Sequence, residues 1–385
     1  MKKLRILLTG GGTGGHIFPL IAVAEELQLQ AKEFGLNLDL RYFGGDYEYA
    51  QNLANQNIRF VPIISSKLRR YWSLLNLIDL IKFPFSLFQL SWKIFWFMPD
   101  VVFSKGGPGA LAAVLASRFY FIPVVIHESD SIPGLTNRIS GFLAKKIFLA
   151  FSSAEPYFKN KDMEIIGNPI RPSLITELNF LEQSGEDAAV QAKKSFGLNL
   201  TEPAILILGG SQGAKRINDF ILENLEILIR DFQILHQVGE RNYDVYKKEF
   251  EFLTKNWNDT EKNRYQFRAF FDKDLAEAFL ASEAVIARAG SGTIFELAAF
   301  GKPAILIPLL DSANGHQKKN AYLYSETRAA IVIQEENLLG NLLVTELKNI
   351  IQNKNLLEKM SDAARSFYKP DSAKIIAKHL LTYAR

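Results

Sequence analysis

One pattern occurs four times along the chain: a short apolar run of strand type, a glycine-rich turn and a helical segment. The four turns lie at 9–15, 104–109, 209–213 and 288–292. A helix that begins directly after such a turn points several free backbone N–H groups at one place, which makes a site for a phosphate or diphosphate. Strands that alternate with helices in this way predict an α/β fold with parallel sheets.

The repeated pattern divides the chain into two similar halves. Apolar runs in the first half predict strands at 4–8, 58–64, 100–103, 122–126 and 146–150, with another within 38–46. Those of the second half predict strands at 203–208, 233–238, 265–270, 284–287, 304–308 and 330–334. We therefore predict two Rossmann-like, doubly wound parallel-sheet domains, with ligand sites that face each other across a cleft.

The division between the halves falls where the sequence becomes rich in turn-forming and polar residues, around 166–172 and in the segment that follows. We expect one domain at 1–167 and a second at 168–365, followed by a C-terminal helix within 366–385. That helix is amphipathic, and its sequence allows it to pack on either half.

The composition excludes several classes of function. The chain has 385 residues and no cysteine, so it contains no disulfide, no thiolate metal site and no cysteine nucleophile. Its net charge is only +4, which does not indicate a nucleic-acid-binding protein. The first apolar run, in MKKLRILL, is too short for a secretory signal peptide and predicts the first buried strand instead.

The turn at 288–292 precedes a helix predicted at 293–300. Glu296 lies one turn inside this helix, where its carboxylate is placed to bond the hydroxyls of a ribose. However, Thr293 and Glu296 also have the spacing of a capping box, in which they only satisfy donors at the helix end. The residues alone leave both interpretations open.

The turn at 9–15 contains the G-x-G-x-x-G spacing of dinucleotide-binding proteins. This match has low specificity, because almost any run so rich in glycine satisfies it. A nicotinamide cofactor would also require an acidic residue at the end of the second strand. Asp39 and Asp46 do not fit that position.

The segment 67–97 differs in character from the rest of the chain. It contains three of the four tryptophans and many phenylalanines and leucines, but charged residues and Pro84 interrupt it too often for a membrane-spanning helix. Aromatic residues flanked by cations such as Lys67, Arg69 and Arg70 are typical of a segment that lies in a membrane interface. The alternative is a pair of helices packed on the sheet, with lysines extended to solvent.

Six motifs occur in a fixed order: GGTGGHIFP, HESDSIPGLTNR, GNPIRP, GGSQGAKRIN, RAGSGTIFE and HQKKNA. Together they closely resemble the MurG family of peptidoglycan N-acetylglucosaminyltransferases, over nearly the full chain. The resemblance implies the GT-B fold, with a C-terminal helix that returns to the first domain. It also implies transfer of N-acetylglucosamine from UDP-N-acetylglucosamine to the 4-hydroxyl of the muramyl unit of lipid I. Lipid II would form with inversion, without a metal or other cofactor.

The resemblance implies that the second half binds the donor, UDP-N-acetylglucosamine. Ser211 corresponds to a diphosphate contact, Phe271 to a backbone contact with uracil, and Gln317 to a contact with the donor sugar. Arg171 corresponds to an arginine that reaches the donor from the hinge. The other donor contacts lie at the start of one helix, with the last of them on the ribose: Ser291, Gly292, Thr293, Ile294, Phe295 and Glu296.

In the first half, the resemblance implies that Thr13, Gly14 and Gly15 border the donor and the diphosphate of the lipid acceptor. Displacement with inversion needs a general base beside the acceptor hydroxyl. His16 is the first candidate, because an unperturbed imidazole titrates at about pH 6.5. The alternative role for His16 is to bond only to the loop at the helix start.

Several positions depart from the family or imitate another one. Asp130 stands where the family commonly has asparagine, so it accepts hydrogen bonds instead of donating them, and it is a second candidate for the base. His316 replaces a frequent glutamine, and the turn at 104–109 is an unusual version of the family's second loop. The sequence Asp272-Lys-Asp274 imitates the D-x-D of metal-dependent transferases, but we interpret it as a helix cap.

Three other interpretations remain: a UDP-sugar-dependent diacylglycerol glycolipid synthase of the same fold, an NAD(P) dehydrogenase, and a membrane-associated sugar-nucleotide-binding protein without catalysis. The resemblance favours the transferase, peripheral on the cytoplasmic face of the bacterial cell membrane. Its partners would be UDP-N-acetylglucosamine, lipid I and an anionic membrane surface, but no nucleic acid. The product would serve cell-wall synthesis, and thereby cell shape and division.

Overall fold

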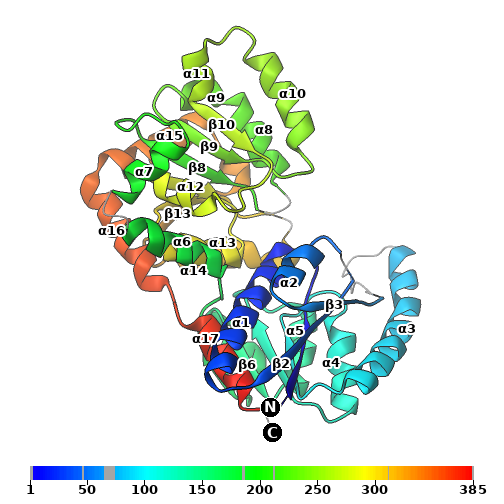
Figure 1. Cartoon of the computed structure of the whole chain (residues 1–385). Helices are drawn as coiled ribbons and strands as arrows, with labels where there is room; N and C mark the ends of the chain where they lie inside the picture. Colours follow the sequence, from blue (N-terminus) through cyan, green and yellow to red (C-terminus); the bar gives the residue numbers. More distant parts are fainter. Residues whose placement is uncertain are drawn as a thin grey trace. The chain divides into compact units, whose positions relative to one another are not determined.

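The structure is a computed structural model that describes residues 3–45, 47–64, 74–183, 187–210, 213–310 and 312–383. The chain divides into two compact units (Figure 1). Unit 1 comprises Met1–Arg171 and Lys369–Arg385, and unit 2 comprises Pro172–Tyr368. The first boundary therefore follows Arg171 and not residue 167, and the C-terminal segment belongs to unit 1.

Unit 1 contains a sheet of seven parallel strands in the order β3-β2-β1-β4-β5-β6-β7. The strands are β1 (Lys3–Thr9), β2 (Asn37–Gly44), β3 (Arg59–Pro62), β4 (Val101–Ser104), β5 (Val124–Glu128), β6 (Lys146–Leu149) and β7 (Met163–Ile165). The strand order runs outward from β1 in both directions, which is the doubly wound arrangement.

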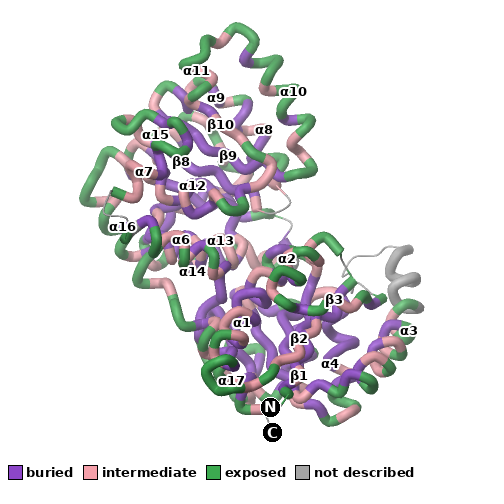
Figure 2. The backbone as a smooth tube through the Cα atoms, viewed as in Figure 1, coloured by how far each residue is buried: buried purple, intermediate pink, exposed green. Residues whose placement is uncertain are grey.

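Helices cover both faces of this sheet, and the side chains of β1 show the consequence. Ile6 and Leu8 belong to one apolar cluster and Leu7 to another, so these three consecutive residues are all buried. The strands of this sheet are accordingly coloured mainly as buried (Figure 2). The helices of unit 1 are α1 (Gly14–Glu33), α2 (Ala50–Asn55), α3 (Leu74–Phe97), α4 (Ala110–Phe119), α5 (Leu135–Leu143) and α17 (Ser372–Leu381), with a 3-10 helix at Ser152–Phe158.

The C-terminal helix α17 packs on α1. Ile376 and Leu380 are fully buried in the same cluster as Ile17 and Leu20 of α1. Burial of one such side chain contributes about 1.5–3 kcal/mol. These contacts attach α17 to unit 1, a choice that its amphipathic sequence left open.

Unit 2 repeats the plan with six parallel strands in the order β10-β9-β8-β11-β12-β13. The strands are β8 (Ala204–Leu208), β9 (Gln233–Gln237), β10 (Tyr265–Arg268), β11 (Ala284–Ala287), β12 (Ala304–Leu306) and β13 (Ala330–Val332). The helices are α6 (Pro172–Gln183), α7 (Ala188–Ser195), α8 (Lys215–Glu223), α9 (Leu225–Leu228), α10 (Tyr243–Leu253), α11 (Asp259–Asn263), α12 (Leu275–Ala281), α13 (Ser291–Ala299), α14 (His316–Ser325), α15 (Gly340–Gln352) and α16 (Lys354–Phe367).

Three local features differ from the sequence prediction. The strand β7 is an addition, since the predicted series ended at residue 150; its three residues MEI carry too little pattern to be recognised. The helical segment predicted after the turn at 209–213 is two helices, α8 and α9, divided at Asn224, whose side-chain amide donates to the Phe220 carbonyl (2.8 Å). The segment before β4 is one helix over the described part, α3, and not a pair.

Each sheet has one point where the strand order reverses direction. In unit 1 this point lies between β1 and β4, and in unit 2 it lies between β8 and β11. Open α/β sheets bind ligands beyond the carboxyl ends of the strands at such points. The four glycine turns of the sequence follow these four strands, so the topology brings them together in two pairs, one in each unit.

Candidate active site

In unit 1, the turns after β1 and β4 lie in direct contact. Gly107 has a φ of +87°, and a Cβ atom at this position would lie only 2.7 Å from the Cα atom of Gly11. The two loops also share a backbone hydrogen bond, from the Lys105 N–H to the Thr9 carbonyl (2.9 Å). Only glycine allows backbones to approach so closely in this conformation.

The imidazole of His16 lies beside these two loops and is partly exposed. Its Nδ1 is 2.9 Å from the Thr13 hydroxyl oxygen, and its Nε2 lies next to Gly107, 3.3 Å from where a Cβ atom would be. When the Nδ1–H donates to Thr13, Nε2 is the unprotonated nitrogen that a general base needs. The bond to the loop, proposed above as the alternative role, is therefore present and is compatible with catalysis.

Beneath these loops lies a buried polar cluster that the sequence did not predict. His127 Nε2 donates to the Gly167 carbonyl (2.9 Å), so Nδ1 is left to accept from the ammonium group of Lys105. The same ammonium donates to Ser129 Oγ (2.6 Å) and Asn168 Oδ1 (3.2 Å). Lys105 is only 2% exposed, which is rare for a lysine and explains why it needs three bonds.

Burial shifts the titration of this cluster. Loss of hydration lowers the pKa of Lys105 to about 7, although the charges of Glu128 and Asp130 oppose the shift. Burial raises the pKa of Glu128 to about 7, and the Asp130 charge adds to this rise. Burial, and then the Lys105 charge, hold the pKa of His127 well below its usual value, so its ring is neutral. Lys105 and Glu128 therefore both titrate near neutral pH.

Asp130, the second candidate base, lies at the edge of this cluster and is half-buried. Its backbone N–H donates to one oxygen of Glu128 (2.9 Å), whose other oxygen accepts from the Asn137 side chain (3.0 Å). Asn137 also donates to the His127 carbonyl (3.2 Å). Glu128 therefore holds the HESD turn in place, a role that the sequence analysis did not assign to it.

In unit 2, the helix α13 presents its N-terminus at the reversal point. Its N-cap residue is Gly290, and no side chain caps it. A Cβ atom at Gly290, Gly292 or Gly210 would meet nothing within 4 Å among the described residues. Ser291 is 6% exposed, and its hydroxyl has no hydrogen-bond partner in the part of the chain that the structure describes. A buried hydroxyl and free N–H groups beside open space are what an anion site requires.

The capping-box interpretation of Thr293 and Glu296 is wrong, because α13 begins two residues before Thr293. Both residues lie inside the first turns of the helix and are half-buried. The side chains of Ile294 and Phe295 are 0% and 1% exposed and form part of the core. At these two positions, only the backbone is available to a ligand.

Behind α13, a buried ion pair fixes the end of β11. Arg288 donates to the Ile307 carbonyl (3.1 Å) and to one carboxylate oxygen of Glu335 (2.6 Å). The other oxygen of Glu335 accepts from Arg216, at the start of α8 (3.0 Å). Glu335 therefore joins the two loops of the reversal point, and no motif in the sequence indicated it.

The remaining predicted donor contacts are distributed around the carboxyl edge of the sheet. Phe271 is fully buried, and its backbone N–H donates to Gln237 (3.0 Å). The side-chain oxygen of Gln317 accepts from the Leu309 N–H (3.1 Å), which fixes the loop after β12. Ser211 lies outside the described residues.

Two further predictions concern charged residues. Arg171 is the last residue of the first segment of unit 1, and its guanidinium lies 4.8 Å from the ring centre of Phe18 on α1. Asp274 is the N-cap of α12, as predicted by position, but its carboxylate bonds the Asp272 N–H (3.2 Å) and Arg268 in place of the helix donors. No cluster of three or more His, Cys, Asp or Glu side chains suited to a metal ion occurs among the described residues.

Comparison with known proteins identifies the family. Residues 6–149 match the glycosyltransferase family 28 N-terminal domain, and residues 204–376 match the C-terminal domain of that family. The protein named UDP-N-acetylglucosamine–N-acetylmuramyl-(pentapeptide) pyrophosphoryl-undecaprenol N-acetylglucosamine transferase in Legionella pneumophila is 35% identical over 94% of this chain and 92% of its own. The chain belongs to this transferase family.

A second relative and a solved structure agree with this assignment. The transferase of the same name from Borrelia hermsii is 32% identical, over 98% of this chain and 97% of its own. The crystal structure of MurG from Acinetobacter baumannii superimposes with a TM-score of 0.70 at 25% identity, covering 98% of this chain and 99% of that one. The GT-B fold and the family predicted from the motifs are confirmed, and the dehydrogenase interpretation is excluded.

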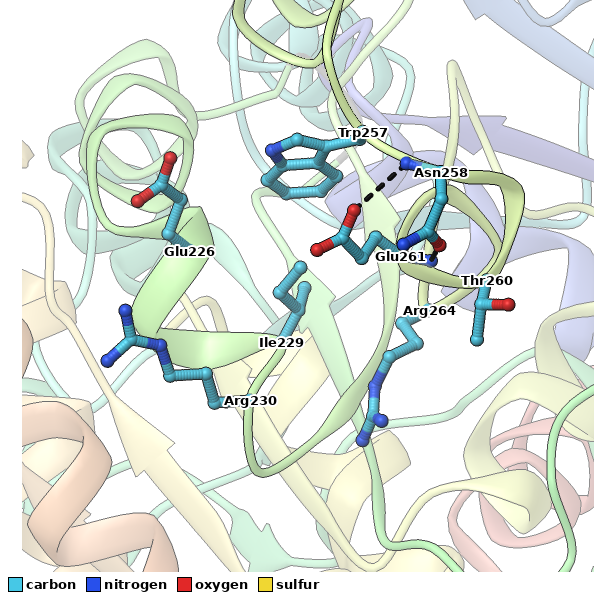
Figure 3. Close-up of a pocket in the computed structure, with 8 residues that line it drawn as sticks. All are labelled: Glu226, Ile229, Arg230, Trp257, Asn258, Thr260, Glu261 and Arg264. Carbon is cyan, nitrogen blue, oxygen red and sulfur yellow. Dashed lines mark hydrogen bonds between the residues drawn. The ribbon is translucent and has the colours of Figure 1, made fainter.

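A cavity of about 430 Å³ in unit 2 is lined by residues outside the glycine loops (Figure 3). Its residues lie in and directly after α9, directly before and in α11, and just before β10, so it lies at the amino-terminal edge of the sheet. They are Glu226, Ile229, Arg230, Trp257, Asn258, Thr260, Glu261 and Arg264. Asn258 and Glu261 cap α11 mutually, and Arg264 pairs with Glu202 (2.7 Å). Because ligands of parallel sheets bind at the opposite edge, this cavity has no place in donor binding.

Proposed function

We propose that this protein transfers N-acetylglucosamine from UDP-N-acetylglucosamine to the 4-hydroxyl of the muramyl unit of lipid I, and so makes lipid II. The observation that carries the proposal is the relationship to transferases of this name over nearly the whole chain, which includes both reversal-point sites. The same observation disfavours the diacylglycerol glycolipid synthase and the non-catalytic binding protein.

The donor is bound by unit 2 in this proposal. The N-terminus of α13, with Ser291, Gly292 and Thr293, stabilises the diphosphate through backbone N–H groups and the Ser291 hydroxyl. Support comes from the open space at these glycines and from the lack of a partner for that hydroxyl among the described residues. Glu296, one turn further on, bonds the ribose. Gln317, whose side chain bonds the loop after β12, contacts the sugar.

The acceptor is bound by unit 1, beside Thr13, Gly14 and Gly15. His16 Nε2 removes the proton of the attacking hydroxyl while Thr13 holds the ring through Nδ1, an arrangement supported by the 2.9 Å contact. The hydroxyl oxygen forms a bond to the anomeric carbon as the bond to UDP breaks. The helix-start N–H groups and Arg171 then stabilise the leaving diphosphate, so the step requires no cation.

The first test is transfer of labelled N-acetylglucosamine from its UDP donor to a short-chain lipid I analogue in the presence of EDTA. Wild type should transfer; His16→Ala should lose about 10²–10⁴-fold in kcat, the usual range for a general base. Glu296→Ala should mainly raise the KM for the donor. Wild-type transfer that vanishes with EDTA would contradict the metal-free mechanism, and transfer only to diacylglycerol would contradict the acceptor.

We further propose that unit 1 binds the cytoplasmic face of the bacterial cell membrane through α3. One face of α3 packs on the sheet through Leu90 and Ile94, whereas a row of aromatic side chains on the other face is more than half exposed. This row consists of Phe85, Phe88, Trp92, Phe95 and Trp96. Aromatic rings at this density are suited to the lipid headgroup level. No helix among the described residues is long and apolar enough to cross a membrane.

Sedimentation with anionic phospholipid vesicles tests this contact. The double variant Trp92→Gln/Trp96→Gln should bind such vesicles at least tenfold more weakly, because two large apolar side chains no longer enter the interface. Phe252→Gln, at an equally exposed aromatic position on α10, is the control. Lys67, Arg69 and Arg70 lie outside the described residues, but their neutralisation should reduce binding to anionic vesicles in particular. Unchanged sedimentation of both sets of variants would remove the proposal.

A further inference from the structure

Two buried glutamines occupy opposite ends of the strand β9. Gln233 is 3% exposed and Gln237 is 4% exposed. At the amino end, Gln233 accepts from the Asn199 N–H (2.7 Å) and donates to the carbonyls of Asn199 (2.9 Å) and Glu202 (3.2 Å). At the carboxyl end, Gln237 donates from Nε2 to the Gly210 carbonyl (3.0 Å) and accepts at Oε1 from the Phe271 N–H (3.0 Å). The two side chains are equivalent in type and burial, but only Gln237 lies at the reversal-point edge.

The position of β9 explains what the bonds of Gln237 connect. In the sheet, β9 lies between β8 and β10, so one side chain at its end reaches the loops that follow both neighbours. Gly210 belongs to the glycine turn after β8 and has a φ of +86°. Phe271 follows β10, and its ring is fixed in the core against Phe196, at 6.2 Å between ring centres. Gln237 therefore connects the glycine turn after β8 to a backbone position that is fixed by the core.

We infer that Gln237 is a positioning residue for the donor: it sets the distance between the turn that binds the diphosphate and the Phe271 backbone that binds uracil. The inference rests on the proposed function and on the contacts that the family resemblance implies, in which Ser211 of this turn contacts the diphosphate and the Phe271 backbone contacts uracil. A ligand that spans both segments depends on their spacing, whereas a ligand that uses only one of them does not.

The two ends of the Gln237 amide can be tested separately. Gln237→Leu removes both hydrogen bonds at similar side-chain volume. Gln237→Glu keeps an acceptor for the Phe271 N–H, but its second oxygen repels the Gly210 carbonyl while the carboxyl is ionised. A protonated carboxyl donates like the amide, and burial raises the pKa of a carboxyl. Acid should therefore restore the function of Gln237→Glu but not that of Gln237→Leu.

The experiment measures the KM for UDP-N-acetylglucosamine, the inhibition constants of UDP and uridine, and the thermal midpoint of each variant. Gln237→Leu should raise the donor KM and the UDP constant about tenfold, the loss expected from two neutral hydrogen bonds. Its uridine constant and its KM for the lipid acceptor should stay within threefold of wild type. The donor KM of Gln237→Glu should fall toward the wild-type value between pH 8 and pH 6.

Gln233→Leu is the matched control, since it loses three buried side-chain hydrogen bonds at the other end of the same strand. It should lower the thermal midpoint at least as much as Gln237→Leu does and leave the donor KM within twofold of wild type. Equal changes of KM in the two leucine variants, or a uridine constant that rises as much as the UDP constant, would overturn the inference.

Calorimetric titration with UDP separates this inference from the proposed function. If wild type binds UDP but transfers no sugar to lipid I, the acceptor assignment fails. The role of Gln237 is still tested by comparing Gln237→Leu with wild type in their affinities for UDP and for uridine. If wild type does not bind UDP, both the inference and the donor site are overturned.

Discussion

The two reversal-point sites share a topology but differ in what fills them. In unit 1, the glycine turns touch each other, and a lysine, a histidine and a glutamate are buried directly beneath them. In unit 2, the glycines at the helix start face open space, and the Ser291 hydroxyl lacks a partner within the described ranges. The same strand–turn–helix pattern therefore produces one closed and one open site.

The difference has a physical consequence for each ligand. The open site of unit 2 offers backbone donors to an anion without moving any neighbour, which suits a soluble nucleotide that must enter and leave. The closed site of unit 1 holds His16 between rigid loops over charges that titrate near neutral pH, which suits a group that must exchange a proton. Replacing a turn glycine by alanine should therefore lower the thermal midpoint in unit 1, but raise the donor KM without lowering the midpoint in unit 2.

The largest effect is expected for Gly107→Ala in unit 1. The new Cβ would lie 2.7 Å from the Cα of Gly11, at a φ of +87° that L-residues rarely adopt. Together, backbone strain and overpacking cost about 3 kcal/mol. We expect a thermal midpoint several degrees lower, and a transfer rate reduced about a hundredfold because the His16 ring is displaced.

Gly35→Ala is the control for Gly107→Ala, because Gly35 also has a positive φ (+63°) but an added Cβ would meet no described atom within 4 Å. It should show only the backbone cost of about 1 kcal/mol and normal transfer. Differential scanning calorimetry with steady-state kinetics checks both variants. A wild-type midpoint for Gly107→Ala would show that the two turns are not in close contact in solution.

A smaller and different effect is expected for Gly292→Ala in unit 2. The added methyl group meets no described atom, and alanine favours a helix over glycine by up to about 1 kcal/mol. The thermal midpoint should therefore be unchanged or higher, while the KM for UDP-N-acetylglucosamine rises about tenfold, because the methyl group enters the space of the diphosphate. Gly134→Ala, at the equally open start of α5, should leave the donor KM unchanged. A donor KM unaltered by Gly292→Ala would remove the diphosphate from this helix start.

The contrast between local and distant contacts explains which features the sequence could predict. The strands and the four glycine turns are encoded by neighbouring residues, and the parallel order follows because each strand alternates with a helix. The buried state of Lys105 depends instead on Asn168, which lies far along the chain. Likewise, Gln237 and Glu335 bond to residues from other loops, so no local spacing reveals them.

The capping-box interpretation shows how a correct local rule leads to a wrong structure. Thr293 and Glu296 have the right spacing, but Gly290 starts the helix earlier, so neither side chain is at the end. A free helix end in that place is unfavourable for stability and useful for binding an anion. One available signal was the glycine on each side of Ser291, since a helix start intended only for stability would have a polar cap residue there.

The smallest effect expected concerns pH and the charges beneath the closed site. The carboxyl of Glu128 keeps its proton up to about pH 7 in the folded protein, whereas the unfolded chain releases it near the ordinary value of 4.5. Raising the pH across this window therefore favours unfolding, and this contribution is absent from Glu128→Gln. Loss of the Glu128 charge also lowers the pKa of Lys105 further, which acts in the same direction. The thermal midpoint of Glu128→Gln relative to wild type should thus rise by a few degrees between pH 5 and pH 7. Glu155→Gln, at an exposed position, should show no such trend. If the midpoint of Glu128→Gln relative to wild type also stays constant with pH, the carboxyl of Glu128 is ionised in the folded state.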